Sequence, residues 1–163
     1  MTWYQQLTAT MAAYNLPTVY TNAAGFVVKQ QYFKMEKSRA FSPLGELRIT
    51  TPSDDMKVSK QVDGIAANVT HCNDSALVVL ASEGFAGTLT VIHDSLGTHA
   101  CDVPDLLKSI QEGMVRMYVQ PVLEQMLEDN AATLPEGEDI SRVLPAQGGF
   151  DLNEMLSARY LFC

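Results

Sequence analysis

The sequence predicts an α+β fold in which β-hairpins pack on amphipathic helices. Short β-branched runs occur in pairs separated by turn residues, which is typical of hairpins. Over longer segments, apolar residues recur at three- and four-residue spacing, which is typical of helices with one buried face. With 163 residues and 47% hydrophobic content, the chain can bury one core.

The first part of the chain is expected to form a helix and a short hairpin. Apolar residues at helical spacing predict a helix over residues 2–13, which ends before Pro17. Two strand-like runs, 18–21 and 26–28, flank Asn22-Ala23-Ala24-Gly25, a sequence typical of turns. These runs are therefore predicted to pair as a hairpin.

Residues 29–58 are predicted to form a longer, basic hairpin inserted into the fold. Its arms cover about 30–41 and 46–51 around the turn Ser42-Pro43-Leu44-Gly45. Residues 29–60 hold seven of the eleven basic residues against four acidic ones, although the chain carries a net charge of −8. That overall charge argues against a free-standing nucleic-acid-binding protein. The hairpin is either a solvated charged surface or a local contact for nucleic acid.

A long helix is predicted over about residues 59–80. Its apolar spacing gives a buried stripe made of Ile65, Val69, Cys72, Ala76 and Val79. Asn68, His71 and Ser75 recur on a second face, which carries polar chemistry. On the residue pattern alone, His71 is a hydrogen-bonded structural histidine.

The run Ile92-His93-Asp94-Ser95 joins two predicted strands, 88–92 and 96–101. Asp94 would lie at the tip of an apolar hairpin at the edge of the core, where a carboxylate is costly unless a positive group meets it. We expect this group to be a metal ion, and the alternative is ordinary turn chemistry. His93 either fixes the polar surroundings of the hairpin or is a hydrogen-bonded core histidine.

The remaining sequence predicts helices and a linker. One helix begins at Asp102-Val103-Pro104 and extends to about residue 118, and a second covers 123–130. Residues 135–150 form a linker to the C-terminal segment, and Asp151 is expected to cap a short helix there. Without internal repeats or a second domain, residues 1–163 are predicted to form a single region.

Composition excludes several classes of protein. No apolar stretch reaches the roughly 20 residues needed to cross a bilayer, and the N-terminus lacks the pattern of a signal peptide. The three cysteines, Cys72, Cys101 and Cys163, have no C-x-x-C spacing and fit a reducing compartment. The histidines lack zinc-ligand spacing with them, so no structural zinc site is expected.

Four segments, in this order, resemble the last part of the single-subunit RNA polymerases of bacteriophages and mitochondria. They are the strand pair of 21–32, the helix containing Gly64-Ile65-Ala66-Ala67-Asn68, the motif Ile92-His93-Asp94-Ser95, and the aromatic C-terminal tail. Strand, His-Asp, strand is the third palm motif of such polymerases. Ser95 is similar to the RNA polymerases, since related DNA polymerases usually carry Glu there. The resemblance implies a C-terminal palm and fingers fragment of a right-hand polymerase.

The resemblance also implies roles for individual residues. Asp94, with His93 beside it, would be catalytic, and its carboxylate would hold Mg²⁺ in a two-metal site for nucleotidyl transfer to an RNA 3′ hydroxyl. His71 matches a histidine that helps to sense the ribose 2′-hydroxyl of the incoming nucleotide. Phe162 and the terminal carboxylate of Cys163 match an aromatic foot beside the active site, which makes them nucleotide-binding candidates.

The long hairpin resembles the specificity loop of this family, which reads the promoter in the major groove. Alternation along a strand places Arg48 and Thr50 on one face, with Arg39 and Lys37 on the facing arm. Arginine can make the bidentate contact to guanine that such reading requires, whereas Lys37 is suited to a phosphate. These four residues are the predicted DNA contacts.

Two parts of the family's active site are missing from the sequence. No second palm aspartate motif precedes Asp94, and no tyrosine is followed by glycine, as the fingers helix would require. One carboxylate cannot build a two-metal site, so the chain alone is expected to be inactive. Because Met1 opens the chain close to a structural boundary, we expect the small subunit of a split phage polymerase that acts in the host cytoplasm. Its partners would be a larger subunit with the missing motifs A and B, the DNA template and promoter, nascent RNA and nucleoside triphosphates, with no membrane contact.

Two alternatives remain. The chain could be a non-catalytic interaction module that keeps a polymerase fold, although the presence of Asp94, His71 and Phe162 argues against this. It could also be a fragment of a family A DNA polymerase. Ser95 and the hairpin insertion count against that interpretation.

Overall fold

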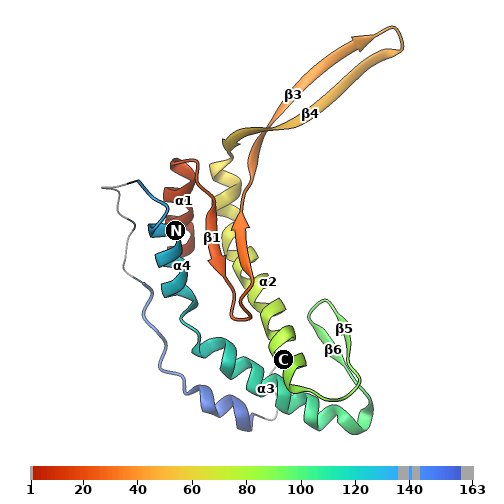
Figure 1. Ribbon diagram of the computed structural model, residues 1–163, viewed down its shortest axis with the longest axis vertical. Coiled ribbons are helices and arrows are strands. Elements are labelled where there is room, and N and C mark those ends of the chain that lie inside the picture. Colours follow the sequence, from red (N-terminus) through yellow and green to blue (C-terminus); the bar gives the residue numbers. More distant parts are fainter. Residues whose placement is uncertain (1, 136–139, 141–143, 159–163) are drawn as a thin grey trace.

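The computed structural model describes residues 2–135, 140 and 144–158, and it is a mixed α and β structure (Figure 1). The α-helices are α1 (Trp3–Ala13), α2 (Val58–Gly84), α3 (Val103–Val119) and α4 (Val122–Ala131). Two 3-10 helices are η1 (Ala100–Asp102) and η2 (Leu152–Ser157). Three separate antiparallel hairpins pair β1 (Thr18–Thr21) with β2 (Val27–Gln30), β3 (Phe33–Ser42) with β4 (Gly45–Met56), and β5 (Thr90–Ile92) with β6 (Ser95–Gly97). The predicted combination of helices and hairpins is therefore confirmed. In the part of the chain that the structure describes, no helix is both long and apolar enough to cross a membrane.

The core lies where α1, α2 and α4 surround the β1–β2 hairpin (Figure 1). Its buried apolar side chains are Leu7, Met11, Tyr20, Ile65, Val69, Met126 and Ile140. Helix α1 begins with a capping box, in which the Thr2 hydroxyl accepts a hydrogen bond from the Gln5 backbone and the Gln5 side chain accepts one from Thr2. Asn130 of α4 is fully buried and bonds both the N–H and the C=O of Val19, so it holds α4 against β1.

Helix α2 is the longest element, and it runs past both ends of the predicted segment. Its N-terminal part packs on α1 and its C-terminal part on α3. The predicted stripe is buried at Ile65, Val69 and Ala76 but only half-buried at Cys72 and Val79. At Gly113 of α3 the two helices approach closely, because a Cβ atom there would lie 3.1 Å from the backbone nitrogen of Ala81 in α2.

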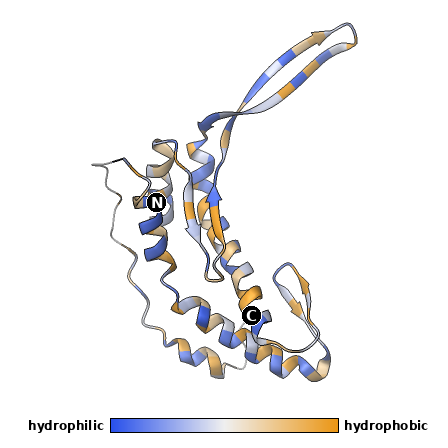
Figure 2. Cartoon of the chain, viewed as in Figure 1, coloured by the Kyte–Doolittle hydropathy of each residue, from blue (hydrophilic) through white to orange (hydrophobic). Residues whose placement is uncertain are grey.

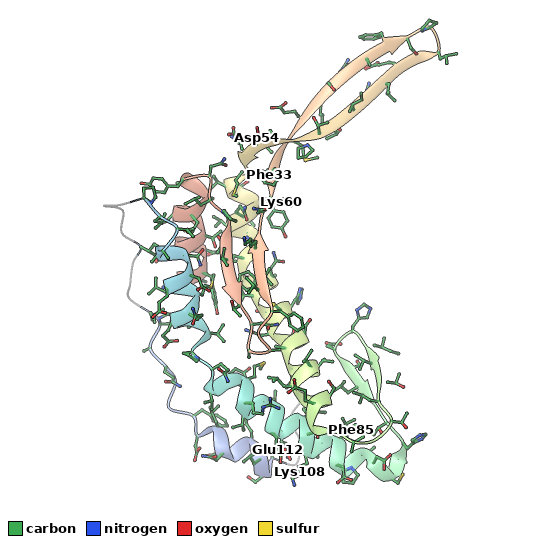
Figure 3. The ribbon with its side chains drawn as sticks, in the orientation of Figure 1. Phe33, Asp54, Lys60, Phe85, Lys108 and Glu112 are labelled. Carbon is green, nitrogen blue, oxygen red and sulfur yellow. The ribbon has the colours of Figure 1, made fainter. Side chains whose placement is uncertain are left out.

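The β3–β4 hairpin projects from the helical body as a long arm (Figures 1 and 2). The predicted end of the second arm at about residue 51 is wrong, because β4 continues to Met56. Pro52 is tolerated in a two-stranded sheet, since an edge strand does not need every N–H for pairing. The base of the arm is held by Asn15, whose amide donates to the Asp54 carbonyl at 2.9 Å and accepts from the Met56 N–H at 2.7 Å. Asp54 and Phe33 mark this base in Figure 3.

The β5–β6 hairpin is shorter and more exposed than predicted. Each strand has three residues, and 100–102 form η1 instead of extending the second strand. The expected position at the edge of an apolar core is wrong for the described residues, because Val91 and Ile92 are 45% and 66% exposed. The apolar faces of α2 and α3 pack on each other and leave the hairpin uncovered. Asp102 also forms no side-chain cap on α3, although proline does stand in the first turn of that helix as predicted.

Candidate active site

His93 and Asp94 form the two-residue turn between β5 and β6. The pairing of Ile92 with Ser95 leaves only these two residues to reverse the chain. His93 has a φ angle of 56°, in the left-handed region that tight hairpin turns require. The backbone therefore holds the Asp94 carboxylate at the tip of the hairpin, where it is exposed.

This tip faces the C-terminal half of α2 across an open cavity of about 350 Å³. The wall on the hairpin side is His93 and Asp94, and the wall on the helix side is His71, Asp74 and Ser75. Three residues singled out from the sequence, His71, His93 and Asp94, are thus brought together although they come from two distant elements. The cavity therefore combines the Asp94 carboxylate, the imidazole groups of His71 and His93, which can donate or accept a hydrogen bond, and open space for a ligand.

The two carboxylates of the cavity are uncommitted. Within the described part of the chain, neither Asp74 nor Asp94 accepts a hydrogen bond or joins an ion pair. The Ser75 hydroxyl already has a partner, because it donates a hydrogen bond to the His71 carbonyl at 3.1 Å. Asp74 is not among the predicted site residues, but it lies in the cavity wall. Its position three residues after His71 was the signal for this, since such residues share a helix face.

A buried polar network fixes α2 just before His71. The Gln30 side chain of β2 donates to the carbonyl and the side-chain oxygen of Gln61, at 2.8 and 2.9 Å. The Asn68 amide donates to the Gln30 side chain at 2.8 Å and to the Tyr32 hydroxyl at 2.9 Å. The ammonium of Lys60, a residue labelled in Figure 3, lies 4.7 Å from the centre of the Tyr32 ring. Asn68, expected on the polar face, is therefore used to position the helix.

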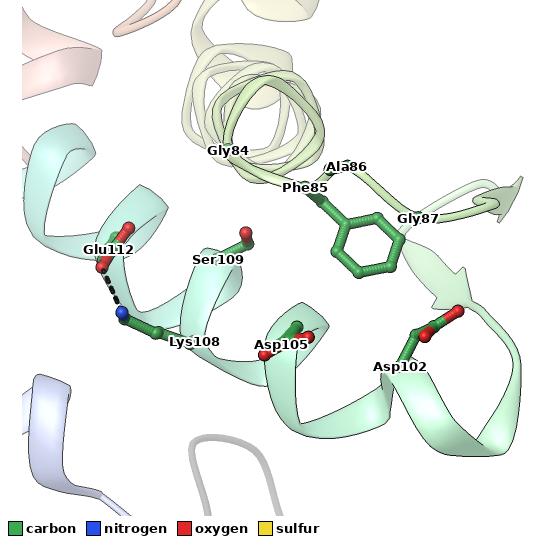
Figure 4. Close-up of a pocket in the computed structure, with 9 residues that line it drawn as sticks. All are labelled: Gly84, Phe85, Ala86, Gly87, Asp102, Asp105, Lys108, Ser109 and Glu112. Carbon is green, nitrogen blue, oxygen red and sulfur yellow. Dashed lines mark ion pairs between the residues drawn. The ribbon is translucent and has the colours of Figure 1, made fainter.

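A second cavity, of about 280 Å³, lies where α2 ends and α3 begins, and it contains none of the predicted site residues (Figure 4). Its charged lining includes the Lys108–Glu112 ion pair, with 3.9 Å between the charged atoms. The Phe85 ring covers the backbone of Gly87, where a Cβ atom would lie 2.5 Å from the ring. A larger residue at position 87 would require the Phe85 ring to move.

Asp94 suits Mg²⁺ as a single ligand, because Mg²⁺ prefers carboxylate oxygens and is commonly held by one or two of them together with substrate phosphates. Among the described residues, however, no group of three His, Cys, Asp or Glu side chains could hold a metal ion. Phe162 and Cys163 lie outside the described residues.

The β3–β4 arm places all four predicted DNA contacts on one face. The register pairs Arg39 with Arg48 and Lys37 with Thr50, and cross-strand partners point to the same side of a hairpin. The opposite face carries smaller or apolar side chains, Ala40, Leu47, Ser38 and Ile49, apart from Glu36 and Thr51. The arm thus has one basic face and one largely uncharged face.

Comparison with known proteins gives a consistent result. The family model for DNA-dependent RNA polymerase matches residues 2–143. The chain is 32% identical over 174 residues to DNA-directed RNA polymerase 3, chloroplastic, of Nicotiana sylvestris, covering 99% of this chain and 17% of that protein. It is 30% identical over 169 residues to DNA-directed RNA polymerase 2A of Nicotiana tabacum, covering 99% and 49%. It is also 30% identical over 168 residues to DNA-directed RNA polymerase 1, mitochondrial, of Arabidopsis thaliana, covering 98% and 16%.

The chain thus spans between about one sixth and one half of the length of these relatives. The match extends over nearly the whole chain, including the β3–β4 arm, the α2 helix and the Asp94 hairpin. The family suggested by the four sequence segments is therefore confirmed. This chain belongs to the DNA-dependent RNA polymerase family.

Proposed function

We propose that this chain forms part of the catalytic centre of a DNA-directed RNA polymerase, where a nucleoside triphosphate is joined to an RNA 3′ hydroxyl. The observation that carries the proposal is the meeting of His71, His93 and Asp94 around one open cavity. Membership of the family supplies the class of reaction, because the relatives are named as DNA-directed RNA polymerases.

Each residue of the cavity has a proposed role that follows from its chemistry. Asp94 supplies a carboxylate ligand at a rigid turn, so its oxygens stay directed at the cavity. When bound there, Mg²⁺ would activate the 3′ hydroxyl and stabilise the leaving pyrophosphate. His71, on the opposite wall, can donate to or accept from the ribose 2′-hydroxyl, which separates ribonucleotides from deoxyribonucleotides. His93 holds the strained turn that presents Asp94, and Phe162 and Cys163 would close the site beside the nucleotide.

Polypeptide from outside these 163 residues would complete the site. The uncommitted carboxylate of Asp94 needs further metal ligands, and the exposed Val91 and Ile92 beside it form an apolar surface that a protein partner could cover. We propose a larger subunit that carries the second aspartate and the fingers helix, so that the chain alone is inactive. The cytoplasm of a phage-infected host stays a prediction, since two of the three relatives described above are named as chloroplastic or mitochondrial.

The β3–β4 arm would contact the promoter with its basic face. Arg39 and Arg48 are suited to guanine in the major groove, Thr50 to a base edge, and Lys37 to a phosphate. The length of the arm and its projection from the body support this role, since the groove can then be reached at a distance from the cavity (Figure 1).

The test is the Asp94→Asn variant in the polymerase assembled with its larger subunit. Elongation of a primed template should fall by about a thousandfold or more, because a neutral amide is a poor Mg²⁺ ligand. Co-elution with the larger subunit should be unchanged. The control is Asp63→Asn, which removes an exposed carboxylate of α2 outside the cavity. Normal elongation by assembled Asp94→Asn protein would refute the metal-ligand role and favour the non-catalytic module.

A further inference from the structure

Among the regularly paired residues 35–42 and 45–52, the basic face of the β3–β4 arm contains one acidic residue, Glu46. Arg39 and Arg48 are direct cross-strand partners there, and like charges in that position destabilise a hairpin. A single oxygen of Glu46, Oε1, lies 3.3 Å from Arg39 Nε and 3.4 Å from Arg48 Nε. One carboxylate therefore bridges both guanidinium groups.

The register of the hairpin makes this arrangement possible. Gly45, with a φ angle of 129°, ends the turn, and the next residue returns to the face of Arg48, two positions further along β4. Across the hairpin, Glu46 pairs with Phe41, which is two residues from Arg39. Phe41 and Glu46 are thus the pair next to both arginines on the side of the turn, and Glu46 is the charged member of that pair.

Burial and geometry show which atoms remain available. The Glu46 side chain is 31% exposed, whereas those of Arg39 and Arg48 are 63% and 74% exposed. The Glu46 carboxylate accepts a hydrogen bond from Arg48 Nε, and its ion pair with Arg39 is also at Nε. Their terminal amino groups have no partner among the described residues. Two N–H donors from the end of one guanidinium are what a bidentate contact to O6 and N7 of guanine requires.

We propose that Glu46 is a specificity-determining residue, which holds both arginines by Nε so that their free ends are aligned for guanine. Its negative charge also opposes binding to phosphates alone, because it cancels part of the charge that attracts any DNA. The inference rests on the proposed contact between this arm and DNA. It predicts that removing the charge makes binding to DNA tighter and less selective.

The experiment compares variants of the polymerase that contains the full chain, using a pool of randomised duplex DNA. Sequencing the bound fraction gives the enrichment of the best sequences over the pool, and titration with the unselected pool gives the non-specific affinity. For Glu46→Gln, enrichment should fall about tenfold for each lost bidentate contact, while affinity for the unselected pool rises with a steeper salt dependence. Glu46→Asp keeps the charge but is too short to bridge both arginines, so it should lose enrichment without gaining non-specific affinity.

The matched control is Glu36→Gln, which removes the same charge from the opposite face of the same arm. It should raise non-specific affinity and leave enrichment unchanged. Equal enrichment for Glu46→Gln and wild type, or equal losses for Glu46→Gln and Glu36→Gln, would overturn the role of Glu46. If wild type enriches no sequence, the proposed reading of DNA by the arm is itself refuted, together with this inference.

Discussion

Replacing Gln30 with leucine tests whether the buried polar network fixes the helix that carries His71. Gln30 is 4% exposed and Gln61 is 1% exposed. The change removes the hydrogen bonds from Gln30 to the carbonyl and the side chain of Gln61, and the one that Gln30 accepts from Asn68. Leucine has a similar volume, so the loss is mainly polar.

The magnitude follows from these contacts. Each lost hydrogen bond contributes about 1 kcal/mol, and a buried partner left unpaired costs about 1–3 kcal/mol more. The Gln61 side-chain oxygen is left in that state, whereas Asn68 keeps its bond to Tyr32. The free energy of unfolding should therefore fall by about 4–6 kcal/mol, measured by urea denaturation with far-ultraviolet circular dichroism.

The control is Gln31→Leu, the same change at the neighbouring exposed residue, which should alter stability by about 0.5 kcal/mol or less. The double variant Gln30→Leu/Gln61→Leu should lose less stability than the sum of the two single variants, because no polar partner is left alone. Additive losses, or a Gln30→Leu effect no larger than that of Gln31→Leu, would refute the network.

Two further predictions concern the cavity and the core. In the assembled polymerase, His71→Ala should increase incorporation of deoxyribonucleotides relative to ribonucleotides by about tenfold, because one hydrogen bond to the 2′-hydroxyl is lost. The control His99→Ala, outside the cavity, should leave this ratio unchanged. An unchanged ratio for His71→Ala would exclude the ribose contact. Burial, with smaller effects from the nearby Cys72 and Tyr32, raises the pKa of Tyr20 from 10.0 to about 12. The folded state therefore favours the neutral phenol, and the stabilisation that this gives the fold is fully present below pH 10. The free energy of unfolding should fall by roughly 2–3 kcal/mol between pH 10 and 12. This fall should be less steep for Tyr20→Phe than for the control Tyr118→Phe, which changes an exposed tyrosine. Equal pH slopes for the two variants would contradict this explanation.

The order and type of the main elements could be predicted because their signals are local. Helix α2 follows from apolar spacing, and the turn at His93 and Asp94 follows from the residues that flank it. The length of β4 could not be read in the same way, since Pro52 is normally a sign that a strand has ended. The strand continues because pairing with β3, at Met35, compensates for the poor local preference.

The buried polar residues were harder to predict than the apolar core. Asn130 bonds to Val19 across 111 positions, and Gln30 bonds to Gln61 across 31. A polar side chain shows no periodic signal for such a partner, so in the sequence it looks like a surface residue. The same applies to Asp74, whose place across the cavity from Asp94 depends on how the β5–β6 hairpin folds back toward α2.

The exposed β5–β6 hairpin connects these findings to function. Its strands have the apolar sequence of a buried hairpin, yet the described chain covers neither Val91 nor Ile92. A sequence under pressure only for solubility would carry polar residues there, because exposed apolar strand edges promote association. The pattern is explained if this hairpin packs against polypeptide from outside these 163 residues. Under the function proposed above, that packing would also bring further ligands toward Asp94, so burial of the hairpin and completion of the proposed metal site would occur together.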